Sequence, residues 1–307
     1  MLFTIFLGLE ALAVTIGNSF TIAVFRKHKL ALRRTFYLLI NLTFADLMIG
    51  ITATVQLAFN IYNIATSQQM TRLAKFDAVH TFFGTASIVS LLTIALETLY
   101  AIAWPFRHRL TSKRTYILWI AVVWCFSAVL FALELSRKFS STTIDDLFSI
   151  WFVTCGIIVI LITISCSYLA IWFYSKKEIP GISQNSRLKT KKRAKTLFIV
   201  TLLSVITWLP FALTEAHSQL VDHWTFKIGH ETNSVLVIGR VLQLSNSFLN
   251  PIVYSFRMPE FRRSLKHIFS KRKSSKTQSR EIRLKKALST DLPQAALVGF
   301  SNLNPNY

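Results

Sequence analysis

Seven apolar stretches, separated by short polar connectors, fill most of the chain up to about residue 256. The hydrocarbon core of a bilayer is ~30 Å thick, so a spanning α-helix needs about 20 apolar residues. Segment 157–162 is apolar on every side, which is typical of helices in lipid or inside a bundle. We therefore expect an all-α protein with seven transmembrane helices. The expected spans are 2–25, 36–62, 77–104, 115–136, 147–174, 194–219 and 232–256.

The composition and the placement of charge support a membrane protein. Apolar residues make up 52% of the chain and charged residues only 16%, which fits one integral membrane bundle. Of the 35 Lys and Arg residues, 29 lie in the tail and in the connectors after the first, third and fifth spans, and five lie in the other connectors. Basic residues mark the cytoplasmic side, so we expect a multi-pass plasma-membrane protein with its amino end outside and its carboxyl end in the cytoplasm. The net charge of +21 then reflects topology and attraction to anionic lipid, and nucleic acid is not an expected partner.

The chain divides into a membrane domain and a tail. Residues 1–269 are expected to form the seven-helix domain, ending in a short cytoplasmic amphipathic eighth helix that begins near Pro259. Residues 270–307 are Lys/Arg/Ser-rich and are expected to be a disordered basic tail. The connector 176–195 is predicted to be a flexible loop. The sequence has no matched half-repeats and no His/Asp/Glu metal cluster, which disfavours a seven-helix transporter or a membrane enzyme.

Polar residues within the spans are functional candidates, because a polar group in hydrocarbon is costly. Asn18, Asp46, Asn246 and Asn250 lie in spans one, two and seven. We expect them to meet in a polar cluster near the middle of the bundle.

Short motifs follow one another on successive spans. They are Gly17-Asn18, Asn41-Leu42-Thr43-Phe44-Ala45-Asp46-Leu47, Trp124-Cys125-Phe126-Ser127, Trp208-Leu209-Pro210 and Asn250-Pro251-Ile252-Val253-Tyr254. With these motifs in this order, the chain resembles the rhodopsin-like (class A) family of G-protein-coupled receptors from the first span to the amphipathic helix. A single motif is weak evidence, whereas five in order are specific.

The resemblance implies a cell-surface receptor without enzymatic activity. It would bind an extracellular small-molecule, peptide or lipid ligand and signal through heterotrimeric G-proteins by outward movement of the sixth helix, with arrestin as a further partner. A ligand-binding scavenger or an arrestin-biased receptor with weak G-protein coupling is the alternative.

The resemblance also implies an ion site. Asp46 matches the family's aspartate that binds Na⁺ together with polar side chains such as Ser87, Asn246 and Asn250. The alternative is a buried carboxyl that is only hydrogen-bonded to Asn18 and Asn250. Apart from this Na⁺ ion, no cofactor is expected.

Activation residues are implied by the same motifs. Pro210 removes a helix hydrogen bond and should kink the sixth span, which supplies a pivot. Trp208 resembles the family's toggle at the base of the ligand pocket, although a tryptophan in a bundle can serve packing alone. Tyr168 and Tyr254, the latter in the motif with Pro251, resemble tyrosines that swing inward on activation.

Three titratable residues lie in the outer third of their helices. His80 precedes Glu97 by seventeen residues, ~25 Å along a helix. Glu215 lies seven residues beyond Trp208, and Arg240 lies ten before Asn250. By resemblance, these three line the ligand pocket together with Phe211, Gln56 and Trp208. The alternatives are an ion pair of Glu215 with Arg240 and a hydrogen-bonded core histidine.

Departures from the family pattern narrow the ligand class. His80 stands where amine receptors carry aspartate, and the seventh span has no lysine for retinal. The chain also lacks the cysteine at the outer end of span three and the proline of span five. This combination is weakly similar to the melanocortin, cannabinoid and adenosine group.

The inner end of span three differs most from the family pattern. Family members carry an acid followed by an arginine here, whereas this chain has Glu97 followed by Thr98. Glu97 then has no adjacent cation, and no residue beside it replaces the planar donors of a guanidinium. We expect reduced G-protein coupling, and the alternative is a loosely held resting state with high basal activity.

Overall fold

The computed structural model describes residues 2–27, 36–66, 73–139, 143–176, 184–224, 234–257 and 261–264. In these residues the chain is helical and has no strand, so the all-α prediction is confirmed. The chain divides into two compact units, Met1–Phe261 and Arg262–Tyr307, and the first contains all the labelled helices. They are α1 (Leu2–Lys27), α2 (Tyr37–Thr66), α3 (Leu73–Ala103), α4 (Pro105–Leu110), α5 (Lys113–Phe139), α6 (Thr143–Lys176), α7 (Gln184–Trp224) and α8 (Ser234–Arg257).

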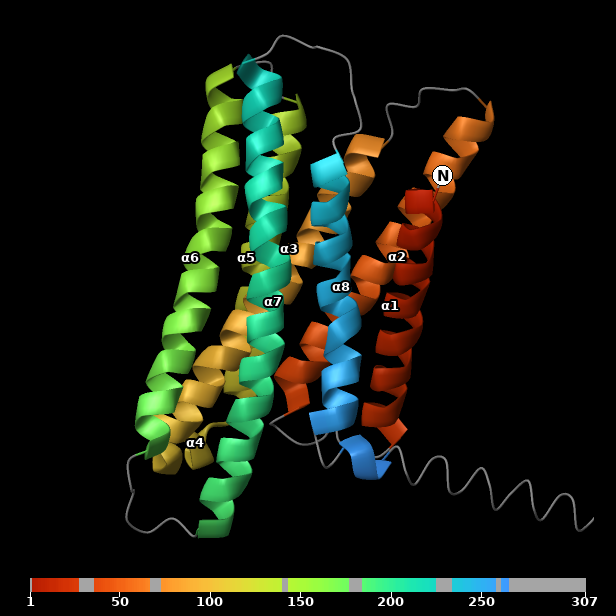
Figure 1. Ribbon diagram of the computed structural model, residues 1–307. Coiled ribbons are helices and arrows are strands. Elements are labelled where there is room, and N and C mark those ends of the chain that lie inside the picture. Colours follow the sequence, from red (N-terminus) through yellow and green to blue (C-terminus); the bar gives the residue numbers. More distant parts are fainter. Residues whose placement is uncertain are drawn as a thin grey trace, which may run out of the picture. The chain divides into compact units, whose positions relative to one another are not determined.

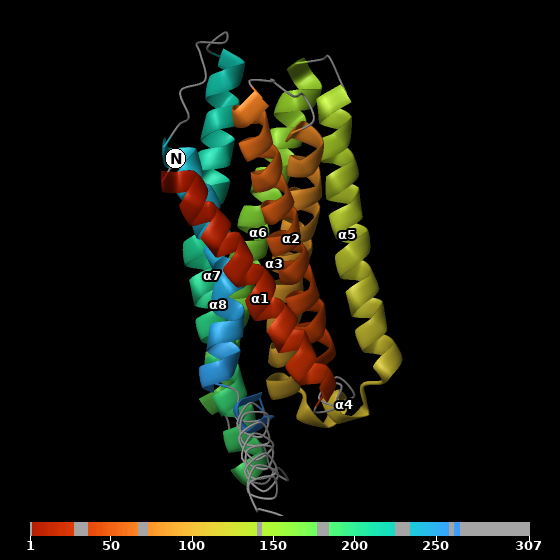
Figure 2. The same cartoon turned by 90° about the vertical axis from the view of Figure 1, so that its right-hand side faces the viewer.

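The long helices of the first unit lie side by side, and α3 is the central one (Figure 1). It packs against α2, α5, α6 and α7, and the short α4 follows its end. On one side of the bundle α1 packs against α2 and α8, and on the other α7 packs against both α6 and α8 (Figure 2). The first, second, third and seventh long helices are thereby brought together around one interior region.

Helices α1, α2, α3, α5 and α6 are long and apolar enough to cross a membrane. In α7 the apolar stretch Leu202–Thr214 is shorter. Each of the seven predicted spans overlaps one long helix. Because the short α4 is also numbered, spans four to seven correspond to α5, α6, α7 and α8. Many large apolar side chains point outward from these helices, among them Leu9, Ile117 and Leu169, which are 61–63% exposed. Such a surface is expected where lipid, and not water, surrounds the protein.

One prediction about the connectors is wrong, and one short helix was not predicted. Segment 184–193, expected to belong to a flexible loop, is the first part of α7. Lys, Arg and Gln are good helix formers, and residues 182–209 contain no Pro or Gly, so the helix extends beyond its apolar part. The short α4 was not predicted, and Pro105 at its start favours it because the fixed φ of proline suits the first helical turn.

The end of the first unit is held by aromatic packing. The Phe25 ring meets Phe36 and Phe261 edge to face, with centroids 5.5 Å apart in both pairs. Of the predicted amphipathic helix 259–269, residues 261–264 are helical and the others lie outside the described residues. The predicted tail 270–307 lies outside them as well.

Close helix contacts fix the register of the bundle. A Cβ added to Gly50 would lie 2.6 Å from the Thr15 hydroxyl oxygen and 2.9 Å from the Thr15 backbone nitrogen. Any larger residue at this position would therefore push α1 and α2 apart.

Candidate functional site

A buried carboxylate lies where α2 faces α3 and α8. Asp46 is fully buried, and its Oδ1 accepts hydrogen bonds from the hydroxyls of Ser87 at 2.7 Å and Ser247 at 2.8 Å. Its Oδ2 accepts a 2.7 Å bond from the Asn250 amide. We call Asp46, Ser87, Ser247 and Asn250 the Asp46 cluster. All three donors are neutral, so none of them balances the charge of an ionised carboxylate.

The two other predicted members lie beside this cluster. Asn18 donates to the carbonyl oxygens of Val14, at 3.0 Å, and Ser247, at 3.1 Å, and is not hydrogen-bonded to Asp46. Its Oδ1 and the Nδ2 of buried Asn246 have no hydrogen-bond partner among the described residues. Asn18 therefore supports the cluster through the α8 backbone.

The sequence interpretation missed Ser247. It lies three residues before Asn250, so both share one face of a helix. That spacing was available from the sequence, but serine is common in membrane helices and did not stand out.

A second polar contact fixes α2 against α3 and α5. The Asn41 amide donates to the Ser90 hydroxyl at 2.8 Å, and the Trp124 indole N–H donates to the Asn41 carbonyl oxygen at 2.8 Å. Asn41 and Trp124 belong to motifs identified in the sequence, and here they position helices around the Asp46 cluster.

Trp208 is buried on α7 against small and polar neighbours. A Cβ on Gly84 of α3 would lie 3.2 Å from the Trp208 ring and 3.2 Å from the Gln243 amide nitrogen of α8. The Trp208 ring also meets Phe211 edge to face, with centroids 5.9 Å apart. The glycine thus makes room for the indole at a junction of α3, α7 and α8.

His80 lies one helical turn before Gly84 on α3. It is buried, and its Nδ1 lies 3.4 Å from the Thr52 hydroxyl of α2. Gln56 follows Thr52 by one turn and is half-buried. Glu215 and Arg240 belong to α7 and α8, and their side chains lie outside the described residues.

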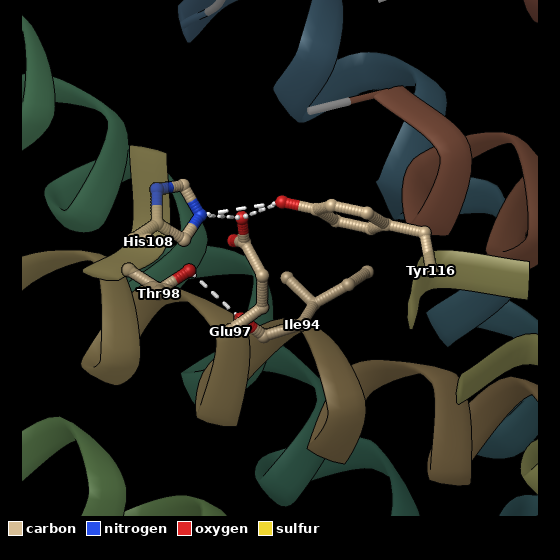
Figure 3. A network of polar contacts seen from close by, with 5 residues as sticks. All are labelled: Ile94, Glu97, Thr98, His108 and Tyr116. Atoms are coloured by element: carbon tan, nitrogen blue, oxygen red, sulfur yellow. Dashed lines mark hydrogen bonds and ion pairs between the residues drawn. The ribbon is translucent and has the colours of Figure 1, made fainter. Parts of the chain in front are cut away.

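A second buried carboxylate, that of Glu97, lies at the other end of α3 and has different hydrogen-bond partners. Glu97 Oε1 lies 2.8 Å from His108 Nε2 on α4 and accepts a 3.0 Å hydrogen bond from the Tyr116 hydroxyl on α5. The Tyr116 hydroxyl also lies 3.2 Å from His108 Nε2, so the three groups close a triangle (Figure 3). We call Glu97, His108 and Tyr116 the Glu97 cluster. Neighbouring Thr98 turns its hydroxyl back to the Ile94 carbonyl at 2.7 Å.

No residue next to Glu97 in the sequence supplies the missing donors, but two residues from other helices do, which the sequence analysis did not foresee. His108 lies eleven residues further on and Tyr116 nineteen, so neither is beside Glu97 in the sequence. The turn into α4 brings the histidine back over the end of α3, and the start of α5 brings the tyrosine. No sequence spacing within one helix predicts that meeting.

The predicted activation residues lie on α6, α7 and α8. Tyr168 is buried, and its ring meets Phe198 of α7 with centroids 5.5 Å apart. Pro210 lies inside α7 and Pro251 inside α8. The side chain of Tyr254 lies outside the described residues.

Together, the bundle, its outward-facing apolar surface and its two buried carboxylates define a helical membrane protein. Residues 17–254 match the family described as 7 transmembrane receptor (rhodopsin family). The chain therefore belongs to this family, and the seven-helix prediction is confirmed. It is a receptor and not an enzyme.

Sequence identity to individual receptors is low and differs little from one receptor to the next. The chain is 25% identical to adenosine receptor A3 of Canis lupus familiaris, over 85% of this chain and 88% of the receptor. It is 27% identical to the G-protein coupled receptor homolog Q2/3L of sheeppox virus, over 81% and 68% of the two chains. It is 25% identical to neuromedin-U receptor 2 of Mus musculus, over 83% and 72%. The relatives support a cell-surface receptor that signals through G-proteins and leave the sub-branch open.

Proposed function

We propose that the chain binds an extracellular ligand between α2, α3, α7 and α8, above Trp208. The observation that carries this proposal is the junction of Trp208 with Gly84 and Gln243, one helical turn from His80. A ligand that contacts His80 is then close enough to influence the indole. Relatives named for adenosine and for neuromedin-U indicate the chemical range to be screened, a nucleoside or a peptide, with lipids added as a third class.

The ligand site is tested with a panel of peptides, nucleosides and lipids, read by cyclic-AMP and calcium reporters. His80→Ala, Glu215→Ala and Arg240→Ala are each expected to weaken the response to the ligand that is found by tenfold or more, because each removes a polar contact in an apolar site. Ile238→Ala, at an exposed position of α8, is the matched control. Unchanged affinity and surface expression in all three variants would refute this site.

The proposed orientation has the amino end outside. The basic last turns of α1, α4 and α6 lie at the same end of the bundle (Figure 1), as expected for a cytoplasmic face. An epitope inserted after Ser141 should stain on intact cells, and one at Tyr307 only after permeabilisation. Tail staining on intact cells would reverse the assignment.

Activation is proposed to move α7 outward at Pro210, opening the cytoplasmic end to a G-protein and then to arrestin. Proline removes one backbone hydrogen bond from α7 and makes bending easier there. A ligand drives this change only by binding the open arrangement more tightly than the closed one. Such a movement would alter the contact between the rings of Tyr168 on α6 and Phe198 on α7.

The Asp46 cluster is proposed to hold Na⁺. Its chemistry fits, because the carboxylate and the hydroxyls of Ser87 and Ser247 are oxygen donors, which small hard cations prefer. The buried Asn18 Oδ1, without a partner among the described residues, is a further acceptor nearby. A bound cation would supply the positive charge that the neutral donors lack.

A second candidate function is a receptor with weak G-protein coupling, biased to arrestin or acting as a scavenger. It is favoured by the geometry around Thr98, whose hydroxyl is bonded within its own helix. Among the described residues, Glu97 is hydrogen-bonded to side chains of α4 and α5 and has no hydrogen bond or ion pair with α7. The test is Thr98→Arg, described in the Discussion.

A further inference from the structure

A groove of about 860 Å³ runs along the outside of the bundle between α6 and α7. Among the described residues, its lining comes from these two helices and from neither α3 nor α8. It is therefore separate from the interior junction at Trp208. Its floor includes the buried side chains of Tyr168 and Ala194.

Two facing stripes of side chains form the walls. On α7, residues 191, 195, 198, 202 and 205 line the groove at alternating spacings of four and three, which keeps them on one helix face. On α6, Leu169 and Trp172 lie opposite and are 61% and 53% exposed. Phe198 and Leu202 of α7 are 45% and 47% exposed. These walls present apolar surface to the membrane.

One end of the groove is basic. Lys191 and Lys195 are both exposed, and the described lining contains no Asp or Glu. A third ammonium, that of Lys176, lies 3.5 Å from the ring centre of Trp172 at the same end. The two lining lysines form no ion pair with any described residue, so their charges remain available to an outside anion.

The length of the groove matches one membrane leaflet. From Lys191 to Val205 is fourteen residues, ~21 Å along the helix. One leaflet with its headgroup region is about 20–22 Å thick, so a lipid with its phosphate at the lysines can lay an acyl chain along the apolar walls towards the bilayer centre.

We propose that this groove binds an anionic phospholipid of the cytoplasmic leaflet, with its phosphate at Lys191 and Lys195 and an acyl chain between Trp172 and Phe198. The proposal rests on the orientation given above, which puts the basic end at the leaflet where anionic lipids are concentrated. Because Tyr168 and Phe198 border the groove, its occupant touches the contact between α6 and the helix proposed to move.

The test uses the full chain in phosphatidylcholine nanodiscs containing a minor fraction of brominated phosphatidylserine or, separately, brominated phosphatidylcholine. Bromine quenches nearby tryptophan fluorescence. The contribution of Trp172 among the seven tryptophans is obtained by difference from Trp172→Phe. We expect phosphatidylserine to quench Trp172 at a roughly five- to thirtyfold lower mole fraction than phosphatidylcholine, since each nearby lysine favours an anionic lipid by about 1 kcal/mol.

Lys191→Gln combined with Lys195→Gln should remove this preference. The pair Arg26→Gln and Lys27→Gln, exposed at the end of α1, should keep it. Equal quenching by the two lipids in the natural chain, or an undiminished preference in the Lys191/Lys195 variant, would overturn the proposal.

Filling the groove gives a second readout that leaves the lysines intact. Ser165→Phe narrows the groove and should reduce quenching of Trp172 by both lipids, whereas Cys166→Phe, at the neighbouring exposed position outside the lining, should not. Equal effects of the two variants would contradict occupancy of the groove. Nanodiscs carry the lipid in both leaflets, so these results do not depend on orientation, which the epitope experiment tests by itself.

Discussion

The two buried carboxylates of the bundle have different kinds of partners. Asp46 accepts hydrogen bonds from the neutral side chains of Ser87, Ser247 and Asn250, which lie on α3 and α8. Glu97 is bonded to Tyr116 and to His108, a residue that can carry positive charge. The first carboxylate is therefore hydrogen-bonded to neutral side chains alone, whereas one partner of the second is a histidine, which is charged only when it is protonated.

The partners also lie on different helices. The Asp46 cluster joins α2 to α3 and α8, whereas the Glu97 cluster joins α3 to α4 and α5. Among the described side chains, neither of these sets of hydrogen bonds includes α7. The bonds described here would therefore not have to break when α7 moves outward.

The largest effect is expected from breaking the first cluster. Asp46→Ala leaves three buried donors without their acceptor, and we expect a loss of stability of about 3 kcal/mol or more, measured as a lower Tm of the purified receptor in detergent. Asp46→Asn keeps the size of the side chain and one acceptor, so its loss should be smaller. An Asp46→Ala receptor with the natural Tm would contradict the assigned role.

The Asp46→Asn variant also tests whether the Asp46 cluster binds a cation. Sodium chloride should raise the Tm of the natural chain more than potassium chloride at equal ionic strength, because a ligand that binds only the folded state stabilises it. Asp46→Asn should lose this difference. A sodium effect that survives in Asp46→Asn would exclude Asp46 as the ligand.

Breaking the second cluster should have a smaller effect. His108→Ala and Tyr116→Phe each remove one donor from Glu97, and each should lower stability by about 1–2 kcal/mol. Arg109→Ala, at an exposed position of α4, is the matched control and should change stability little. In a double-mutant cycle, His108→Ala and Glu97→Gln should couple by about 0.5 kcal/mol or more. Strict additivity of the two changes would show that this contact contributes nothing.

The smallest effect on stability, and the most informative for signalling, is expected from Thr98→Arg. The new guanidinium can pair with Glu97 in competition with His108, so we expect a change of about 1 kcal/mol or less in stability and a marked gain in agonist-driven G-protein activation. The assay compares nucleotide exchange at matched surface expression. Thr98→Lys supplies the charge without the planar donors and should gain less. Robust coupling by the natural chain with no gain from arginine would refute the proposed defect.

The sequence by itself determined the helices and most of the polar residues that matter. Apolar length and the lack of a polar face are local properties, so they predict spans without knowledge of contacts. Ordered motifs identified the family and assigned Asp46, Asn250 and Trp208 to it. The pair Glu97 and Thr98 was recognisable as a departure because family members carry an acid followed by an arginine at this position.

Tertiary structure decided which side chains meet. His108 and Tyr116 reach Glu97 from α4 and α5, and Ser247 reaches Asp46 across about two hundred residues. Such meetings depend on how far each helix is rotated and shifted along its axis. Close packing at Gly50 and Gly84 sets those values, and no periodicity within one helix encodes them. For the same reason the apolar stripes of α6 and α7 are visible in the sequence, but the groove exists only because the two helices turn those stripes toward each other.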